Sequence, residues 1–422
     1  MQGDIRPPKL KKLRPVVKLK PTQTFQPLEP DVVIDESDPS DETSKRRLGL
    51  AAPHKHFTRF WRWWQGLSLK ERLGVGGVGV LVIFAVGVVW IAFIHPSSTP
   101  SVAISTPAKP KPKPKAPITQ ASPLTGLQVD PALANRPVTG VMIENSDAAR
   151  PQSGLQDAGV VYEAIAEGGV TRFLALFQDS TPQYIGPVRS LRPYYIDFAA
   201  PFQASIAHVG GSPDALAIVR SGGYRDLDQF FNSGAYGRIS ARPAPHNVYT
   251  SFAKLDALNS AKGYTTSSFT IWPRKPDKKL AVPTAKNIKF AISGPDYYAN
   301  YAYDSASNTY MRSEGGAPHL DLVSADDKAG VQLHPKVVIA LVMGLTHGVL
   351  DSSGAYYSNY QDSGSGPMYV FQDGDVTQGT WSKASTSEQF SFSDSAGAPI
   401  KLDTGQSWVT IVSAANQVSY TP

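Results

Sequence analysis

Residues 73–94 read LGVGGVGVLVIFAVGVVWIAFI, and this stretch of 22 residues contains no charged side chain. A helix of this length covers the roughly 30 Å hydrocarbon core of a bilayer. A soluble core helix would carry polar residues on one face, and this stretch carries none. A cleaved signal peptide is the alternative interpretation, but its apolar segment is shorter and lies nearer the N-terminus. The sequence therefore predicts a single transmembrane helix.

Basic side chains are concentrated before the predicted helix, and they set its expected orientation. Those nearest to it are Lys45, Arg46, Arg47, Lys55, Arg59, Arg62, Lys70 and Arg72. The first lysine after the helix is Lys109. Lys and Arg beside a span favour its cytoplasmic side, so we expect a cytoplasmic N-terminus and an extracytoplasmic main domain at the plasma membrane.

The net charge differs between the parts of the chain. Residues 1–72 carry a net charge of +6 and residues 95–122 a net charge of +4, whereas residues 123–422 carry −4. The large C-terminal part therefore lacks the basic surface typical of nucleic-acid binding, and we expect no nucleic-acid partner for it. The sequence has no cysteine, which excludes a disulfide framework, a thiolate metal site and a cysteine nucleophile within it.

The composition divides the chain into five parts. Residues 1–72 are polar and rich in proline, which predicts a disordered basic cytoplasmic tail, followed by the transmembrane helix at 73–94. Residues 95–122 contain KPKPKPK and form a Pro/Lys-rich linker. We expect an N-terminal α+β subdomain at 123–273 and a strand-rich C-terminal subdomain at 284–422. The charged, proline-bearing residues 274–283 would separate them.

Local patterns predict the main elements of an α+β fold, a two-subdomain mixed α/β exported region. The predicted strands, hairpins and buried segments are 138–144, 160–167 with 170–178, 204–209, 297–312, 337–343, 369–381, 390–393, 399–402 and 408–412. Ser212-Pro213-Asp214 predicts a helix start, and the helix would end at Arg220 before Gly222-Gly223. A second helix is predicted from Ser251 to Lys262.

The predicted hairpin VVYEAIAEGGVTRFLALF carries two acids and one base. With Gly168-Gly169 as a two-residue loop, Arg172 would have Glu163 and Glu167 as its diagonal neighbours on one face. Two carboxylates invite a glycosidase interpretation, but four strand residues span about 13 Å, beyond the roughly 6.5–9.5 Å of an inverting pair. We therefore interpret Glu163, Glu167 and Arg172 as structural ion pairs.

Three further motifs could bind an anion. IGPVRSLRPYYIDF places Arg189 three residues before Arg192, with Asp197 as a structural ion-pair partner for one arginine. HVGGSPD combines His208, Gly210, Gly211 and Ser212 at a strand–turn–helix junction, where free N–H groups would be presented. RPAPHN contributes Arg242, His246 and Asn247 from a proline-stiffened loop. Helix capping alone would also explain Ser212.

Other chemistries have weak support in the sequence. The histidines show no HExxH or paired metal spacing, and we expect neither a metal nor another cofactor. The sequence contains no GxSxG elbow, P-loop or dinucleotide fingerprint. We therefore assign no catalytic residue.

The ordered run of motifs from PLTGL at 123–127 to GQSWVTIV near the C-terminus resembles the YerB-like family of bacterial envelope proteins. Other pieces of that run are RPVTGVMIEN, ARPQSGL, HVGGSP, APHNVYT, MRSEGGAPHLD and YVFQDGDVTQGTW. The resemblance covers about residues 123–422. It implies a domain of unknown function with N- and C-terminal halves in an exported protein, without an established reaction or ligand. Several members are lipoproteins, whereas this sequence has no cysteine to lipidate.

Together, these observations predict a membrane-anchored, extracytoplasmic envelope protein that binds an anionic or sugar-bearing cell-wall component or a wall-synthesis partner. A hydrolase or transferase acting on wall glycan or peptide is one alternative, with Glu163, Glu167, Asp197 and His208 as candidates. A non-catalytic scaffold, whose arginines are all paired internally, is another. The sequence does not determine the oligomeric state.

Overall fold

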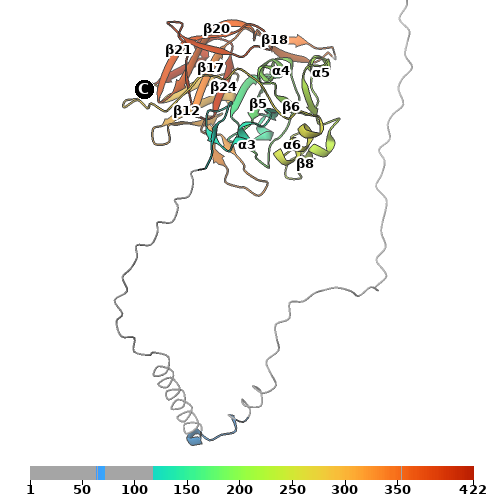
Figure 1. Ribbon diagram of the computed structural model, residues 1–422, viewed down its shortest axis with the longest axis vertical. Coiled ribbons are helices and arrows are strands. Elements are labelled where there is room, and N and C mark those ends of the chain that lie inside the picture. Colours follow the sequence, from blue (N-terminus) through green and yellow to red (C-terminus); the bar gives the residue numbers. More distant parts are fainter. Residues whose placement is uncertain (1–62, 64, 72–116, 353) are drawn as a thin grey trace, which may run out of the picture. The chain divides into compact units, whose positions relative to one another are not determined.

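A ten-stranded sheet joins both halves of the C-terminal part of the chain in the computed structural model, which describes residues 63, 65–71, 117–352 and 354–422. Its strands run, from edge to edge, in the order β22 (Ser391–Asp394), β21 (Asp375–Lys383), β20 (Gly364–Gln372), β17 (Val337–Val342), β24 (Ser407–Val412), β4 (Val160–Ile165), β5 (Thr171–Phe177), β3 (Thr139–Glu144), β6 (Ser205–His208) and β7 (Arg225–Asp228). Figure 1 shows the orange and red strands of the C-terminal half alongside the green strands of the N-terminal half.

Strand β24 joins the two halves, because it pairs in parallel with β17 on one side and with β4 on the other. Every residue of β24, β4 and β5 is buried, as expected for strands covered on both faces. The described residues 117–352 and 354–422 form one compact unit, although the charged segment 274–283 crosses it. The division into subdomains at 123–273 and 284–422 stays a prediction.

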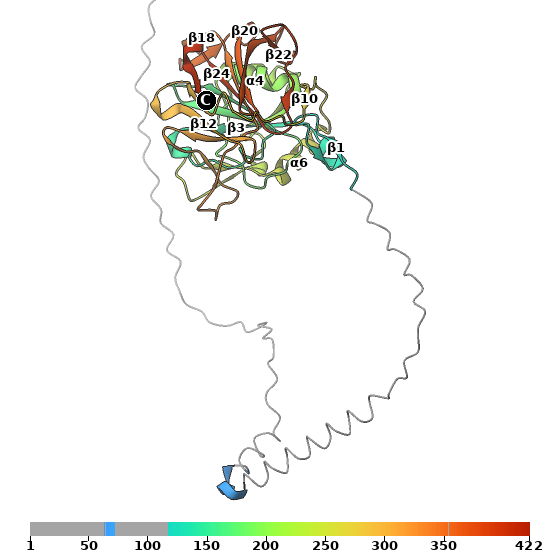
Figure 2. The ribbon, with the colours of Figure 1, turned by 90° about the vertical axis from the view of Figure 1, so that its left-hand side faces the viewer.

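A second sheet of five strands covers part of the large sheet (Figure 2). Its order is β14 (Ala317–Pro318), β13 (Thr309–Glu314), β12 (Tyr298–Asp304), β11 (Asn287–Ala291) and β25 (Val418–Thr421). Smaller two-stranded sheets pair β1 (Gln120–Ala121) with β2 (Gln128–Val129), β8 (Gly237–Arg238) with β9 (Val248–Tyr249), β10 (Arg274–Lys275) with β23 (Leu402–Asp403), β15 (Leu320–Asp321) with β16 (Val331–Gln332), and β18 (Leu345–Leu350) with β19 (Tyr356–Tyr360).

Within residues 117–352 and 354–422, the α-helices are α3 (Pro131–Ala134), α4 (Pro193–Ala199), α5 (Pro213–Arg220) and α6 (Phe252–Ala261). Tyr162 of β4 stacks on Phe198 of α4, with ring centroids 5.0 Å apart. The next residue, Glu163, binds Arg312 of β13 in the five-stranded sheet. Because successive strand residues point to opposite faces, α4 and the five-stranded sheet cover opposite faces of the large sheet.

Most of the predicted elements are confirmed, including the α+β character and the strand-rich C-terminal half. Ser212 caps α5 and Ser251 caps α6 through their side chains, as the sequence predicts. The hairpin of β20 and β21 turns at Asp373 and Gly374, whose φ angles are 58° and 78°. Helix α4 was not predicted from the sequence.

The predicted transmembrane helix at 73–94 lies outside the described residues, as does most of the predicted tail (1–72) and linker (95–122). None of the described helices has the length and apolar character that crossing a membrane requires.

Candidate functional site

The segment 188–192 carries the arginine pair to the carboxyl ends of the parallel strands β3 and β6. Val188 bridges to Ile143 at the end of β3, and Leu191 bridges to Gly211 just after β6. The backbone of Arg189 donates to Met142 (2.9 Å) and accepts from Val209 (3.1 Å). The carboxyl ends of parallel strands are common ligand sites in open α/β sheets. The structure therefore brings two predicted motifs, 189–192 and 208–212, together at this edge.

Glu144, the last residue of β3, is at the centre of this cluster. One of its oxygens accepts from the Ser146 hydroxyl (2.8 Å) and lies 2.8 Å from Nδ1 of His246. The other lies 3.3 Å from Nε of Arg189. Glu144 is buried, whereas the side chains of Arg189 and His246 are 25% and 23% exposed. We call Glu144, Ser146, Arg189 and His246 the Glu144 cluster.

The terminal nitrogens of Arg189 bind no acceptor among the residues that the structure describes. Across the described residues, the contact of Nε with Glu144 is the only ion pair of its guanidinium. Burial lowers the pKa of Arg189, although Glu144 raises it, and the side chain keeps its charge at neutral pH. Arg189 can therefore accept an anion at its two terminal nitrogens without breaking an internal contact.

Arg192 lies deeper and shares one acid with Arg172. Its guanidinium is ion-paired with Glu167, which also binds Nη2 of Arg172 at 2.9 Å. Arg172 donates in addition to the carbonyl of Ser190 (2.8 Å) and so fixes the segment that carries Arg189. In this arrangement Arg172, Arg192 and Glu167 position the cluster, and a ligand-binding role for Arg192 stays a prediction.

His208 and the glycine turn after it have structural roles in positioning the backbone. His208 is fully buried, with Nδ1 2.8 Å from the carbonyl of Gly210 and Nε2 3.0 Å from Asp226. Both ring nitrogens face oxygen acceptors, so neither is free to act as a base. Gly210 has a φ of +59°, and a Cβ on Gly211 would lie 3.0 Å from the carbonyl oxygen of Leu191. These glycines permit the close approach of 188–192.

The remaining predicted ligand-binding residues make local contacts. Ser212 accepts from the backbone N–H of Ala215 at 3.3 Å, the capping role that was the alternative interpretation. Arg242 donates to the carbonyls of Ala148 and Pro151. Asn247 accepts from Arg238 at 2.6 Å. Of the motif 242–247, the structure thus brings His246 to the Glu144 cluster.

Two exposed phenylalanines follow β7, one of them beside the glycine turn, and were not singled out from the sequence. Phe230 and Phe231 follow β7 and are 70% and 72% exposed. Phe230 lies against Gly210, where a Cβ would approach its ring to 3.1 Å. The carboxylate of Asp228 accepts from the backbone N–H groups of both Gly210 (3.0 Å) and Phe230 (3.2 Å). An apolar platform is therefore fixed beside the glycine turn.

The register of the β4–β5 hairpin differs from the prediction by one residue. Arg172 faces Ala164, and Glu163 faces Phe173, because the connection spans 166–170 rather than two glycines. A shift of one residue moves a side chain to the other face of a sheet. Glu163 therefore lies away from Arg172 and pairs with Arg312, while Glu167 from the connection still reaches Arg172.

Asp197 also has a different neighbour from the predicted arginine. It lies on α4 beside Asp362 and Lys383. Burial, with the nearby Asp362 carboxyl, raises the pKa of Asp197 to about 7, although Lys383 acts in the opposite direction. Two adjacent carboxylic acids in a low-dielectric site do not both ionise readily, so this pair favours a bound proton.

The raised pKa of Asp197 predicts a pH-dependent stability. Between its ordinary pKa and about 7, the folded chain binds more protons than the unfolded chain, so the free energy of unfolding falls as pH rises through this window. In melting curves between pH 5 and 8, we expect Asp197→Asn to make the melting temperature less dependent on pH. Asp326→Asn, at an exposed acid, is the matched control. Equal pH dependence in Asp197→Asn and the native chain would contradict this assignment.

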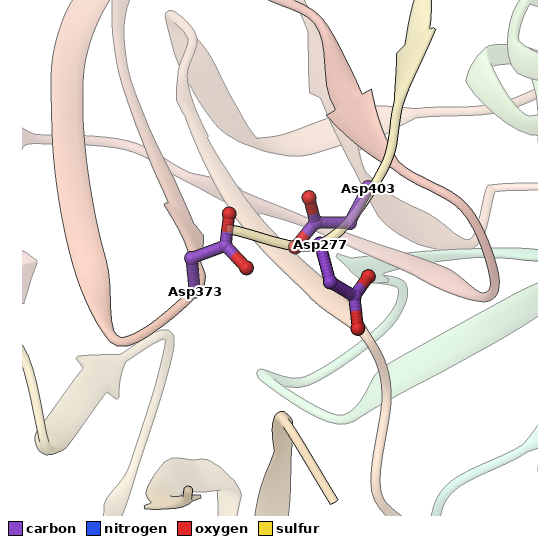
Figure 3. Close-up of side chains that lie close together, drawn as sticks. All are labelled: Asp277, Asp373 and Asp403. Atoms are coloured by element: carbon purple, nitrogen blue, oxygen red, sulfur yellow. The ribbon is translucent and has the colours of Figure 1, made fainter. Parts of the chain in front are cut away.

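A group of three carboxylates, Asp277, Asp373 and Asp403, is the one set of described residues that could hold a metal ion (Figure 3). Lys275 already supplies a cation, because its ammonium group is ion-paired with both Asp373 (2.5 Å) and Asp403. Asp277 is ion-paired with Lys336 at 2.5 Å. Burial raises the pKa of Asp403 to about 6 despite Lys275. These ion pairs connect β10, β23 and the turn between β20 and β21 within the fold.

Two models from one protein family match this chain. Residues 124–265 match the model described as "Protein of unknown function (DUF3048) N-terminal domain", and residues 288–409 match the corresponding C-terminal domain. The chain is similar to "Putative lipoprotein YerB" of Bacillus subtilis (strain 168), with 29% identity over 264 residues, 62% of this chain and 77% of the relative. The crystal structure of the YerB protein from Bacillus subtilis aligns with a TM-score of 0.62 and 26% identity, over 72% of this chain and all of that one.

Proposed function

Since the chain belongs to the DUF3048 family of proteins of unknown function, we propose from its site that it is a membrane-anchored, extracytoplasmic envelope protein that binds an anionic, sugar-bearing component of the cell wall. The observation that carries the proposal is the guanidinium of Arg189, which Glu144 holds at Nε and leaves open at its terminal nitrogens.

The envelope location is supported by the relative and by the sequence. The relative's printed name calls it a lipoprotein, which would place it at a membrane. The 422 residues of this chain contain no cysteine, and the apolar stretch 73–94 is long enough to serve as a membrane anchor. The Lys/Arg bias before that stretch places the family domains outside the cytoplasm.

The anionic nature of the ligand follows from the chemistry of the Glu144 cluster. The two terminal nitrogens of Arg189 suit a phosphate or carboxylate oxygen pair. The Ser146 hydroxyl and Nδ1 of His246 are already engaged with Glu144, so the donors that the cluster offers to an anion are those of Arg189.

The sugar component of the proposal is supported by the phenylalanine platform. Phe230 and Phe231 expose large apolar surfaces beside the glycine turn, and the C–H face of a sugar ring is apolar. Arg220 lies over the ring of Phe231 at 4.9 Å, and its own charge is paired with Asp228 at 2.6 Å. A polymer that alternates charged groups and sugar rings can use both parts of this surface.

The substitution Arg189→Ala tests the proposal. We expect it to weaken binding of anionic wall fragments, measured by titration calorimetry, at least about tenfold, because a charge-assisted hydrogen-bond pair is lost. The melting temperature should change little, since the side chain is partly exposed and Glu144 keeps its contacts with Ser146 and His246. Lys262→Ala removes an exposed charge elsewhere and is the control. Unchanged affinity in Arg189→Ala would rule out this site.

The alternative functions predict different results with the same wall fragments. A scaffold that binds only a wall-synthesis protein would give no heat of binding with any wall fragment in titration calorimetry. A hydrolase or transferase would convert fragments, and its turnover would be lost in His208→Ala or Glu163→Ala. The contacts of His208 with Gly210 and Asp226 do not favour a catalytic role for it.

A further inference from the structure

A cleft of about 340 Å³ lies between the segment after β3 and the strands β13 to β15, apart from the Glu144 cluster. The carboxylates of Asp147 and Asp296 line it together with Arg150, Glu314 and His319, and Pro318 belongs to its apolar wall. Asp147 and Asp296 are exposed, whereas Glu314 and His319 are buried. Acids at an exposed rim thus lead to a buried carboxyl group.

Glu314 has one oxygen without a hydrogen-bond partner, although its side chain is only 1% exposed. Its Oε1 accepts from Nδ2 of Asn145 at 2.7 Å. Its Oε2 lies 3.1 Å from Nδ1 of His319 and 3.4 Å from Nη2 of Arg312 without a hydrogen bond to either. A buried carboxylate oxygen without a partner is costly and calls for a donor.

His319 cannot supply the missing donor. Its Nδ1 accepts a hydrogen bond from Nε of Arg312 at 2.9 Å, so this nitrogen carries no proton. The tautomer inferred from these partners has its proton on Nε2, which donates to Oε1 of Gln152 at 2.9 Å. Burial lowers the pKa of His319 well below its ordinary value, which keeps the ring neutral.

The positive charges near the cleft are already matched. Arg312 is fully buried and binds Glu163 at 2.9 Å. Arg150 is held by Asp147 at 3.2 Å and by Glu314 at 3.3 Å. With Glu314 ionised, the cleft residues Asp147, Asp296 and Glu314 oppose the single charge of Arg150. The cleft therefore lacks positive charge and a hydrogen-bond donor, and an ammonium group provides both.

We propose that this cleft binds a primary alkylammonium group, such as the end of a diamino-acid side chain, with Asp147 and Asp296 attracting the cation and Glu314 accepting its hydrogen bond. The apolar wall, which includes Pro151, Pro318 and Leu320, contacts the alkyl chain. This ligand class is opposite in charge to the one proposed for the Glu144 cluster.

Proton binding by Glu314 links this site to pH. Burial raises the pKa of Glu314 to about 7, with Glu163 acting in the same direction and Arg312, Arg150 and Asn145 in the opposite one. Asp147, Asp296 and the neutral His319 also face the cleft. An ammonium ion binds the ionised form, so affinity rises as pH increases through about 7. The ionised fraction increases about thirtyfold between pH 5.5 and 8, which sets the expected gain in affinity.

The experiment measures the dissociation constant of n-pentylamine for the full chain at pH 5.5 and pH 8, with n-pentanol as the uncharged analogue. We expect binding of the amine that is about thirtyfold tighter at pH 8, and no comparable binding of the alcohol. Glu314→Gln should abolish the pH dependence and weaken binding at pH 8. The double variant Asp147→Asn/Asp296→Asn, at exposed positions, should weaken binding while the chain stays folded.

The outcomes separate this proposal from the one for the Glu144 cluster. Arg189→Ala should leave pentylamine binding unchanged, and Asp326→Asn serves as the control for a distant exposed acid. The proposal is overturned if pentylamine fails to bind at pH 8, if pentanol binds equally well, or if the double variant binds with native affinity.

Discussion

Replacing Arg312 with methionine is expected to lower the free energy of unfolding by about 3–5 kcal/mol, because it leaves a buried charge without its partner. Arg312 lies on β13 with its side chain fully buried. Its guanidinium binds Glu163 of β4 at 2.9 Å and donates to Nδ1 of His319 at 2.9 Å. Methionine fills a similar volume, so the expected loss is electrostatic more than steric.

The surroundings of Arg312 keep it charged. Burial acts to lower its pKa, but Glu163 and the other neighbours raise it overall. Its guanidinium also lies 4.5 Å from the ring centroid of Trp408, whose Nε1 donates to the second oxygen of Glu163 at 3.0 Å. Trp408 is on β24, so this one network joins the five-stranded sheet to β4 and to the strand that links both halves.

Urea unfolding of the native chain and of Arg312→Met measures the effect. A second variant, Arg312→Met with Glu163→Gln, should recover part of the loss, because it removes the unpaired carboxylate. Arg238→Met, at an exposed arginine, should change stability by less than about 1 kcal/mol. A loss below about 1 kcal/mol in Arg312→Met would show that the network contributes little to stability.

Replacing Gly379 with alanine should cost about 3 kcal/mol, through a steric clash between the last two strands at one edge of the large sheet. Gly379 of β21 pairs with Asp394 of the edge strand β22. A Cβ at this glycine would lie 2.0 Å from the backbone oxygen of Ser393. Backbone cannot move aside as a side chain can, so β22 must separate from β21.

Separation of β22 would also expose aromatic residues. Phe390 and Phe392 are buried, and Phe390 contacts Trp381 with ring centroids 5.8 Å apart. Urea unfolding and hydrogen exchange of the β22 amides both report the change. Gly234→Ala is the control, because its Cβ would meet nothing within 4 Å. Native protection of β22 in Gly379→Ala would contradict the predicted clash.

The elements whose signals are local could be predicted from the sequence. Ser212-Pro213 and Ser251 are capping signals, and Asp373-Gly374 supplies the positive φ angles of a tight hairpin. Helix α4 was missed because its tyrosines and phenylalanine resemble a strand, although Pro193 at its first position was an available signal. Capping and turn residues close in the sequence thus indicated where most helices and strands begin or end.

The features that depend on distant contacts could not be predicted. Nothing near β24 indicates that it pairs in parallel between β17 and β4. The register of β4 with β5 depends on the length of the connection between them. The two glycines indicated a two-residue loop, which is shorter than the connection that forms. Glu144 showed no sign of its role, because Arg189 and His246 reach it from positions 45 or more residues away in the chain.

The central claim, that the Glu144 cluster binds an anionic wall component through Arg189, is tested most directly by thermal shift. The native chain and Arg189→Ala are melted with anionic wall-polymer fragments and with uncharged glycan fragments, at low and high salt. One-site binding adds about 2.7 kcal/mol of stability at a hundredfold excess over Kd. The account predicts a shift of the native chain with anionic fragments that decreases at high salt and is lost in Arg189→Ala. An equal shift in Arg189→Ala, or none in the native chain, would contradict it.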